Sequence, residues 1–197
     1  MSLPGLLLLT GFCYILIIGG MSLLRREGLS GQFAVEAIII TALVSGLTYL
    51  TNSPTHPVLL LVLLYLITMR VRLMVDVGNY FAVKGKFGIA ERWYQIAHRL
   101  LPDRTSRLII LVNQGACLLQ QGKLDQAIQT FLDVLQKKRE GHLGVKYEAA
   151  THYNLGIAYR RKAMDTQATL EFNAVIDTWP ASEYARRAAK ALSQKRQ

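Results

Sequence analysis

Cysteine and histidine, the residues that most often bind metals or act as nucleophiles, are few in this chain and are not grouped. Cys13 and Cys117 lie in different halves and match no metal-binding or redox spacing. We expect both to be buried, as free cysteines usually are. The four histidines share no ligand spacing within one predicted element: His56, His98, His142 and His152. The sequence therefore predicts neither a metal site nor a cofactor.

Other catalytic arrangements cannot be recognised either. The sequence has no evident Ser-His-Asp or Cys-His arrangement, no pair of carboxylates in an evident pocket and no glycine-rich phosphate-binding loop. The Gly19-Gly20 pair lies inside an apolar stretch, where it has no phosphate to bind. We therefore expect that this protein is not an enzyme.

Charge divides the chain into two parts. No Asp, Glu, Lys or Arg occurs in residues 1–24 or 37–69. All but two of the 23 basic residues and all but two of the 13 acidic residues lie from Arg70 onward, so this region carries the whole net charge of +10. We therefore expect a membrane domain over residues 1–70 and a basic domain over residues 71–197.

The first apolar stretch covers residues 3–24 and is followed by Arg25 and Arg26. A helix needs about 20 apolar residues to cross the hydrocarbon core of a bilayer, so this stretch is long enough. A cleaved signal peptide is the alternative, but no basic segment precedes the stretch and no clear A-x-A cleavage site follows it. We therefore expect a retained membrane anchor.

The second apolar region is divided by residues 51–57, a polar segment with two prolines that is typical of a turn. Further spans are predicted on either side of it, at about residues 33–50 and 58–75. Both are marginal in length, and the alternative is a hairpin that only dips into the bilayer. Glu36 lies near the N-terminal end of the first of these spans. Arg70 lies in the last turns of the second, where a long basic side chain can reach the interface.

The basic residues that flank the spans predict their orientation. Arg25 and Arg26 lie between the first two spans, Arg70 and Arg72 follow the third, and the turn between the last two has no Lys or Arg. The positive-inside rule then places the N-terminus outside and the C-terminal domain in the cytoplasm. A hairpin that only dips into the bilayer places the C-terminal domain on the same side, because it returns to the side that it left.

A spacing pattern recurs three times in the C-terminal domain. Each unit has a glycine, a bulky apolar residue three positions later, an alanine twelve positions after the glycine, and an aromatic residue four positions after the alanine. A proline follows that alanine by twelve positions in the first and third units. The residues are Gly78, Phe81, Ala90, Tyr94 and Pro102; Gly115, Leu118, Ala127 and Phe131; and Gly156, Tyr159, Ala168, Phe172 and Pro180.

This pattern resembles the signature of the tetratricopeptide repeat (TPR) family, in which glycine and alanine let two antiparallel helices approach closely and aromatic side chains fill the gap. The resemblance implies an all-α fold, an α-solenoid of three helix pairs at about residues 71–104, 108–141 and 149–182. It has two departures. The early tryptophan of the family is replaced in every unit, and about seven extra residues separate the second and third units. In the first and third units the replacing residues are Met74 and His152, each four positions before the repeat glycine.

Both ends of the predicted solenoid have a neighbouring helix. No proline interrupts residues 58–84, and the one glycine there, Gly78, belongs to the repeat pattern, so we predict one continuous helix that begins in the membrane and becomes the first helix of the first pair. Such a helix would hold the pairs rigidly against the bilayer. At the other end, residues 183–195 are predicted to form a capping helix with the polar face that a solenoid needs there.

The resemblance also implies a groove lined by the first helix of each pair, in which TPR proteins bind a peptide or helix. In some members this groove clamps a C-terminal carboxylate, but Val75, Ala150 and Asn154 stand where the basic residues of that clamp would be. The alternative is that the residues predicted to line the groove, given next, pack between repeats instead. The predicted groove residues are Val75, Asn79, Val112, Asn113, Ala116, Tyr153, Asn154, Ile157 and Arg160.

These features predict a membrane-anchored TPR adaptor or scaffold that binds a protein or peptide partner at the cytoplasmic membrane face and assists the assembly of a membrane complex. The alternative is a small membrane sensor or channel-like subunit that uses the TPR region for oligomerisation, although Glu36 and a few Ser and Thr offer little polarity for an ion path. The basic excess would face anionic lipid or attract an acidic partner. Nucleic-acid binding is not expected, because no known binding motif accompanies the charge.

Overall fold

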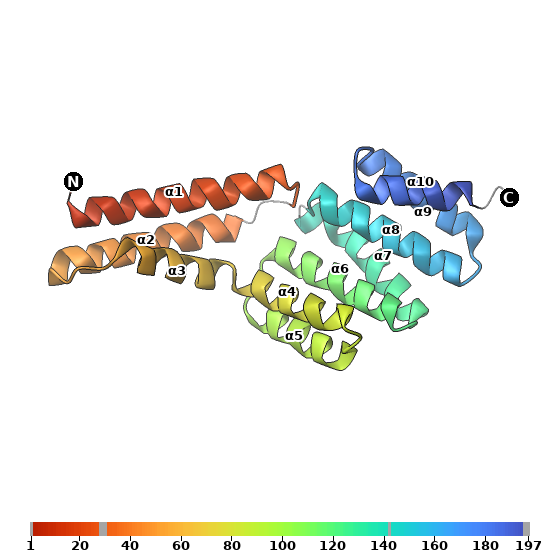
Figure 1. Ribbon diagram of the computed structural model, residues 1–197, viewed down its shortest axis with the longest axis horizontal. Helices are drawn as coiled ribbons and strands as arrows, with labels where there is room; N and C mark the ends of the chain where they lie inside the picture. The colour runs from red at the N-terminus through yellow and green to blue at the C-terminus, as the bar shows by residue number, and fades with distance from the viewer. Residues whose placement is uncertain (1, 28–30, 142, 195–197) are drawn as a thin grey trace.

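The computed structural model describes residues 2–27, 31–141 and 143–194, and these residues form helices joined by short turns, without a β-strand. Two groups of helices lie end to end (Figure 1): α1 to α3 form one group, and α4 to α10 the other. The all-α fold class is therefore confirmed. The helices are α1 Leu3–Leu24, α2 Gly31–Thr51, α3 Pro57–Thr68, α4 Arg70–Val83, α5 Phe87–Arg99, α6 Arg104–Gln120, α7 Leu124–Gly141, α8 Val145–Arg161, α9 Asp165–Thr178 and α10 Glu183–Ser193.

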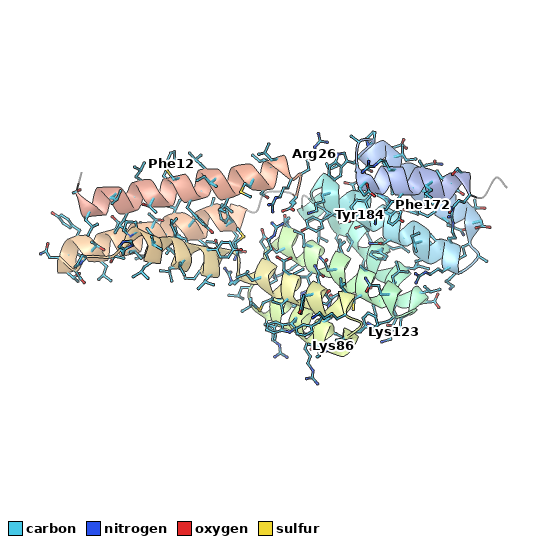
Figure 2. All side chains as sticks on the ribbon, in the orientation of Figure 1. Phe12, Arg26, Lys86, Lys123, Phe172 and Tyr184 are labelled. Atoms are coloured by element: carbon cyan, nitrogen blue, oxygen red, sulfur yellow. The ribbon has the colours of Figure 1, made fainter. Side chains whose placement is uncertain are left out.

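The helices α1 and α2 are each long and apolar enough to cross a membrane, as predicted. Most of their large apolar side chains point away from the protein, as Phe12 does in Figure 2. Cys13 is also exposed on α1, so the prediction that both cysteines are buried was wrong for this residue and holds for Cys117. A surface of exposed apolar side chains is what lipid would cover.

The helices α1 and α2 pack closely around Gly11. A Cβ atom added at Gly11 would lie 2.2 Å from Oγ1 of Thr41, so a larger residue would force the helices apart. Polar bonds add to this packing: Ser45 Oγ donates to the carbonyl of Pro4 at 3.0 Å, and the hydroxyls of Tyr14 and Thr68 are 2.7 Å apart. The last of these bonds connects α1 to α3.

The continuous helix predicted over residues 58–84 is absent, and the prediction was wrong at Met69. The chain bends there by 68°, so that α3 ends at Thr68 and α4 begins at Arg70. With 12 residues, α3 is about 18 Å long at 1.5 Å per residue, too short to cross a bilayer alone. No proline or glycine marks the bend. At the bend, Arg70 contacts three groups: the Glu36 carboxylate and the carbonyls of Ile67 and Leu100.

The helices α4 to α9 form three hairpins: α4 with α5, α6 with α7, and α8 with α9. Short turns join the two helices of each hairpin. These turns contain Gly85 and Gly122 at φ +71° and +77°, where glycine is favoured, and Ala163 at +57°. The extra residues between the second and third hairpins lengthen α7, which reaches Gly141. His142, the centre of that predicted insertion, lies outside the described residues.

One close contact is repeated in all three hairpins. A Cβ atom added at Gly78 would lie 2.5 Å from Cε1 of Tyr94, and the same construction gives 2.6 Å from Gly115 to Phe131 and 2.7 Å from Gly156 to Phe172. All three rings are fully buried. The alanines that begin the second helices, Ala90, Ala127 and Ala168, are buried too. Each hairpin therefore closes around a buried aromatic ring that packs directly against a glycine.

The last helix, α10, covers the end of the third hairpin. Its buried face consists of Ala185, Ala188 and Ala191, which join a cluster that contains Phe172. Ser182 caps the helix, since its Oγ accepts a hydrogen bond from the backbone of Ala185 at 3.0 Å. The predicted cap at this end is therefore a helix in the structure, although Lys195, the last residue predicted for it, lies outside the described residues.

A candidate binding cavity between the apolar helices and the hairpins

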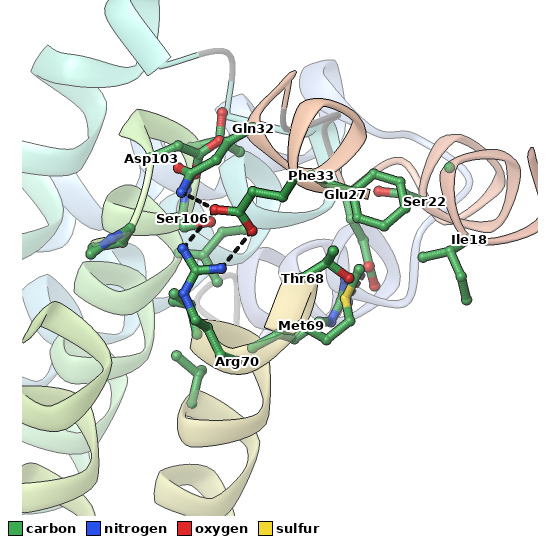
Figure 3. Close-up of a pocket in the computed structure, with 18 of the residues that line it drawn as sticks. Ile18, Ser22, Glu27, Gln32, Phe33, Thr68, Met69, Arg70, Asp103 and Ser106 are labelled. Carbon is green, nitrogen blue, oxygen red and sulfur yellow. Dashed lines mark hydrogen bonds and ion pairs between the residues drawn. The ribbon is translucent and has the colours of Figure 1, made fainter. Parts of the chain in front are cut away.

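A cavity of about 320 Å³ lies where the two groups of helices meet (Figure 3). Its walls come from the ends of all three apolar helices and from the beginnings of α4, α6 and α8. Apolar side chains contribute much of the wall. The main ones are Ile18, Met21, Phe33, Val71, Val75 and Ile109. The cavity therefore has an apolar interior at the level where α1 ends and α2 begins.

Arg70 forms one side of the cavity and connects three elements. Its guanidinium makes a two-point ion pair with Glu36 of α2, with Nη1 2.5 Å from Oε2 and Nη2 2.8 Å from Oε1. It also donates to the carbonyls of Leu100 at 3.0 Å and Ile67 at 2.7 Å. Gln32 donates to Glu36 at 2.6 Å and to the carbonyl of Leu101 at 3.2 Å. This network attaches α2 and the bend at Met69 to the loop after α5.

Glu27 forms a second connection, on the side of the third hairpin. Its side chain is 2% exposed, and its carboxylate accepts hydrogen bonds from Lys146 of α8 at 2.6 Å and from Arg72 of α4. Burial alone would raise the pKa of this carboxyl, but the hydrogen bonds and charges of the two cations outweigh burial and lower it. The carboxylate therefore stays charged and holds α4 and α8 to the end of α1.

Backbone and ring contacts extend this connection. The backbone N–H of Lys146 donates to the carbonyl of Arg26 at 3.1 Å, and the Arg26 guanidinium lies 5.7 Å from the ring centroid of Trp179. Tyr147, which lines the cavity beside these groups, is buried deeply enough to raise its pKa to about 12. It is therefore neutral at physiological pH and can offer a hydroxyl without a charge.

Asp103 shapes the cavity wall formed by α6. Its carboxylate accepts from the backbone N–H of Ser106 at 2.7 Å and so caps the helix. Five of the charged side chains that line the cavity thus have partners within the protein, namely Glu27, Glu36, Arg70, Arg72 and Asp103, while a sixth, Arg25, is exposed. An arrangement of this kind suits an occupant that is mainly apolar, because a strongly charged one would have to break existing ion pairs.

The groove residues predicted on the first two hairpins are largely engaged in packing. Val75 and Val112 are buried, and Val75 also lines the cavity. Asn79 accepts a hydrogen bond from the Tyr94 hydroxyl at 2.7 Å, while Asn113 donates to the carbonyl of Ile109 in its own helix, also at 2.7 Å. Ala116 is partly buried. Each asparagine therefore supports its own hairpin with at least one of its polar atoms.

The groove residues predicted on the third hairpin lie partly under α9 and α10. Tyr153 is in contact with Phe172 and Tyr184, with ring centroids 6.0 and 5.8 Å away. Ile157 packs in the same cluster, and Asn154 is partly buried. Arg160 donates to the carbonyl of Ala191 at 2.7 Å and lies 4.8 Å from the Phe172 ring centroid. Arg160 thus holds α10 in place.

The sequence could identify Glu36 and Arg70 only as charged residues at the limits of apolar segments, and it could not predict their contact. Glu27 and Lys146 are 119 positions apart, and no periodicity brings them together. The only signal in the sequence was a charged residue directly after an apolar segment. It indicates where that segment ends, but not which residue the charge pairs with.

Comparison with protein-family models gave no match, and comparison with curated proteins gave none either. Within the described residues, no group of three or more His, Cys, Asp or Glu side chains could hold a metal ion.

Proposed function

We propose that this protein is a membrane-anchored adaptor of the TPR type, which receives the membrane-proximal segment of a protein partner in the cavity at the membrane boundary. The observation that carries this proposal is the shared wall of the cavity, to which both the apolar helices and the hairpins contribute. A mainly apolar segment that leaves a bilayer would meet this opening directly.

Two findings support the TPR assignment within this proposal. The glycine–aromatic contact has the same geometry in three successive hairpins, and the helix that follows them packs on the last hairpin through its alanines. Both are what an array of TPR units requires. By the positive-inside rule, the proposed orientation puts the hairpins in the cytoplasm and the N-terminus outside.

A scaffold that holds its partner at a membrane must not swing freely, and the bend at Met69 serves this purpose in the proposal. A two-point ion pair and a buried carboxylate with two cations fix the hairpins to α2 and to the end of α1. The adaptor would therefore present its partner at one place and angle, as assembly of a membrane complex requires.

Site-specific photo-crosslinking in native membranes tests this proposal. A photoreactive residue at Ile109, in the cavity wall, should form a crosslink to a discrete membrane protein, whereas one at the exposed Leu170 of α9 should not. A second substitution, Ser106→Trp, should block the cavity and abolish the crosslink while circular dichroism shows an intact fold. A crosslink that persists with the cavity filled would mean that the partner binds elsewhere.

A further variant distinguishes binding of the partner in the cavity from binding in the predicted groove. Changing Asn79, Asn113 and Asn154 together to alanine should leave the crosslink at Ile109 in place, if the partner enters the cavity. Loss of the partner in this variant, with the fold intact by circular dichroism, would assign binding to the groove and not to the cavity.

A further inference from the structure

The loop between α5 and α6 lies beside the apolar helices, at the level of the membrane boundary. The carbonyl of Leu100 accepts from Arg70 at 3.0 Å, and the carbonyl of Leu101 accepts from Gln32, the second residue of α2, at 3.2 Å. Because α2 enters its apolar stretch directly after these contacts, the loop is held where the surface of a bilayer around α2 would begin.

Leu101 stands out in this loop because its side chain is 78% exposed. Its backbone has φ +52°, a conformation that residues with a Cβ atom rarely adopt. The neighbouring Leu100 is partly buried and Pro102 is buried, so the loop has apolar residues on its inner side and still leaves one leucine outside. With α1 and α2 in a bilayer, an exposed apolar side chain at this level would lie at the depth of lipid headgroups and the first acyl carbons.

Three exposed arginines flank this leucine: Arg99 at the end of α5 and Arg104 and Arg107 at the start of α6. The acidic residues closest to them in the sequence and in the network are already engaged. Asp103 caps α6, and Glu36 is paired with Arg70. The loop therefore combines one apolar side chain with a net positive surface, as peripheral elements that bind anionic bilayers do.

We propose that the loop of residues 99–107 is a lipid-binding element that inserts Leu101 into the membrane surface and binds anionic phospholipid headgroups through Arg99, Arg104 and Arg107. This proposal needs α1 and α2 to be in the membrane; Leu101 also lines the cavity, but the proposal does not depend on what the cavity binds or on any protein partner. Lipid contact on this side would fix the first hairpin to the bilayer independently of the ion pairs at Glu36 and Glu27.

Depth-dependent fluorescence quenching in vesicles tests the proposal with the full chain. In a protein with Cys13 and Cys117 changed to alanine, Leu101→Cys is labelled with an environment-sensitive dye and reconstituted in vesicles that contain a lipid-borne quencher. Leu170→Cys, on an exposed position of α9, is the matched control. We expect strong quenching at 101 and little at 170 when roughly a third of the lipid is phosphatidylglycerol.

The arginines and the lipid charge are then varied separately. Changing Arg99, Arg104 and Arg107 to glutamine, or using phosphatidylcholine alone, should lower the quenching at 101 at least about twofold, because each basic side chain near an anionic surface contributes to binding. Circular dichroism and resistance to alkaline extraction show whether each variant is folded and inserted. Loss of insertion would be a failure of anchoring and not of this loop.

Three results would overturn the proposal. A label at position 101 that stays accessible to a water-soluble quencher in anionic vesicles would place the loop away from the lipid. Quenching at 101 that is as strong in phosphatidylcholine alone and in the triple variant as it is for the unchanged arginines in anionic vesicles would remove the role of the arginines. An acidic protein that protects the label in the absence of anionic lipid would show that the surface serves a protein partner instead.

Discussion

Lys146 in α8 lies 2.6 Å from Glu27, a residue at the far end of the first apolar helix that precedes it by 119 positions. Arg72, at the start of α4, binds the same carboxylate. A single buried side chain thus joins the end of α1 to the first and third hairpins. Because Trp179 lies under the Arg26 guanidinium beside this site, its fluorescence can report on the contact.

Changing Glu27 to glutamine should destabilise the junction by about 2 kcal/mol, because two cations would lose a buried anionic partner. The loss should not be larger, because both cations are partly exposed and water can solvate them. The measurement is thermal unfolding followed by Trp179 emission in a Trp93→Phe background. Glu183→Gln is the control: Glu183 also contacts two arginines, Arg186 and Arg187, but on the surface, where ion pairs contribute little. Equal stability of both variants would show that Glu27 does not support the junction.

The same carboxylate predicts a dependence on pH. Because folding lowers the pKa of Glu27 below its ordinary value of 4.5, its contribution to stability is present above that value and is lost as the pH falls through the folded pKa. The difference in unfolding temperature between the wild type and Glu27→Gln should therefore be constant from about pH 7 to pH 5 and shrink below about pH 4.5. A difference that grows in acid would contradict the assignment of a charged Glu27.

The glycine–aromatic contacts predict the effect of adding one methyl group. Gly156→Ala would place a Cβ atom 2.7 Å from the Phe172 ring and should cost about 1–3 kcal/mol in the free energy of unfolding. Gly88→Ala is the control, because nothing lies within 4 Å of an added Cβ there and alanine favours a helix. Phe172→Leu combined with Gly156→Ala should cost less than the sum of the two single changes, as a double-mutant cycle would measure.

Much of the helical layout could be predicted because it depends on local patterns. Apolar runs such as residues 3–24 give long helices, and the regular spacing of glycine, alanine and aromatic residues gives hairpins with turns at Gly85 and Gly122. The bend at Met69 and the burial of Glu27 could not be predicted, because both occur beside contacts between side chains more than 30 positions apart, which local patterns do not reveal. The cavity was missed for the same reason, since its walls come from six helices.

Arg70→Lys tests whether the two-point ion pair with Glu36 maintains the bend at Met69. Lysine keeps the charge but has no planar fork, so it cannot bind both carboxylate oxygens and the carbonyls of Ile67 and Leu100 at once. Spin labels on α2 and α4 should then give a clearly broader distance distribution by double electron–electron resonance.

Arg72→Lys is the matched control for that experiment. Arg72 binds Glu27 through one nitrogen, a contact that lysine can replace, so the distance distribution between the two labels should stay narrow. If both variants kept the distribution of the wild type, packing of α4 on α5 would be enough to fix the bend, and the fork of Arg70 would serve only to neutralise Glu36. A broad distribution in Arg70→Lys alone means that the angle between the membrane helices and the hairpins is set by hydrogen bonds from one side chain.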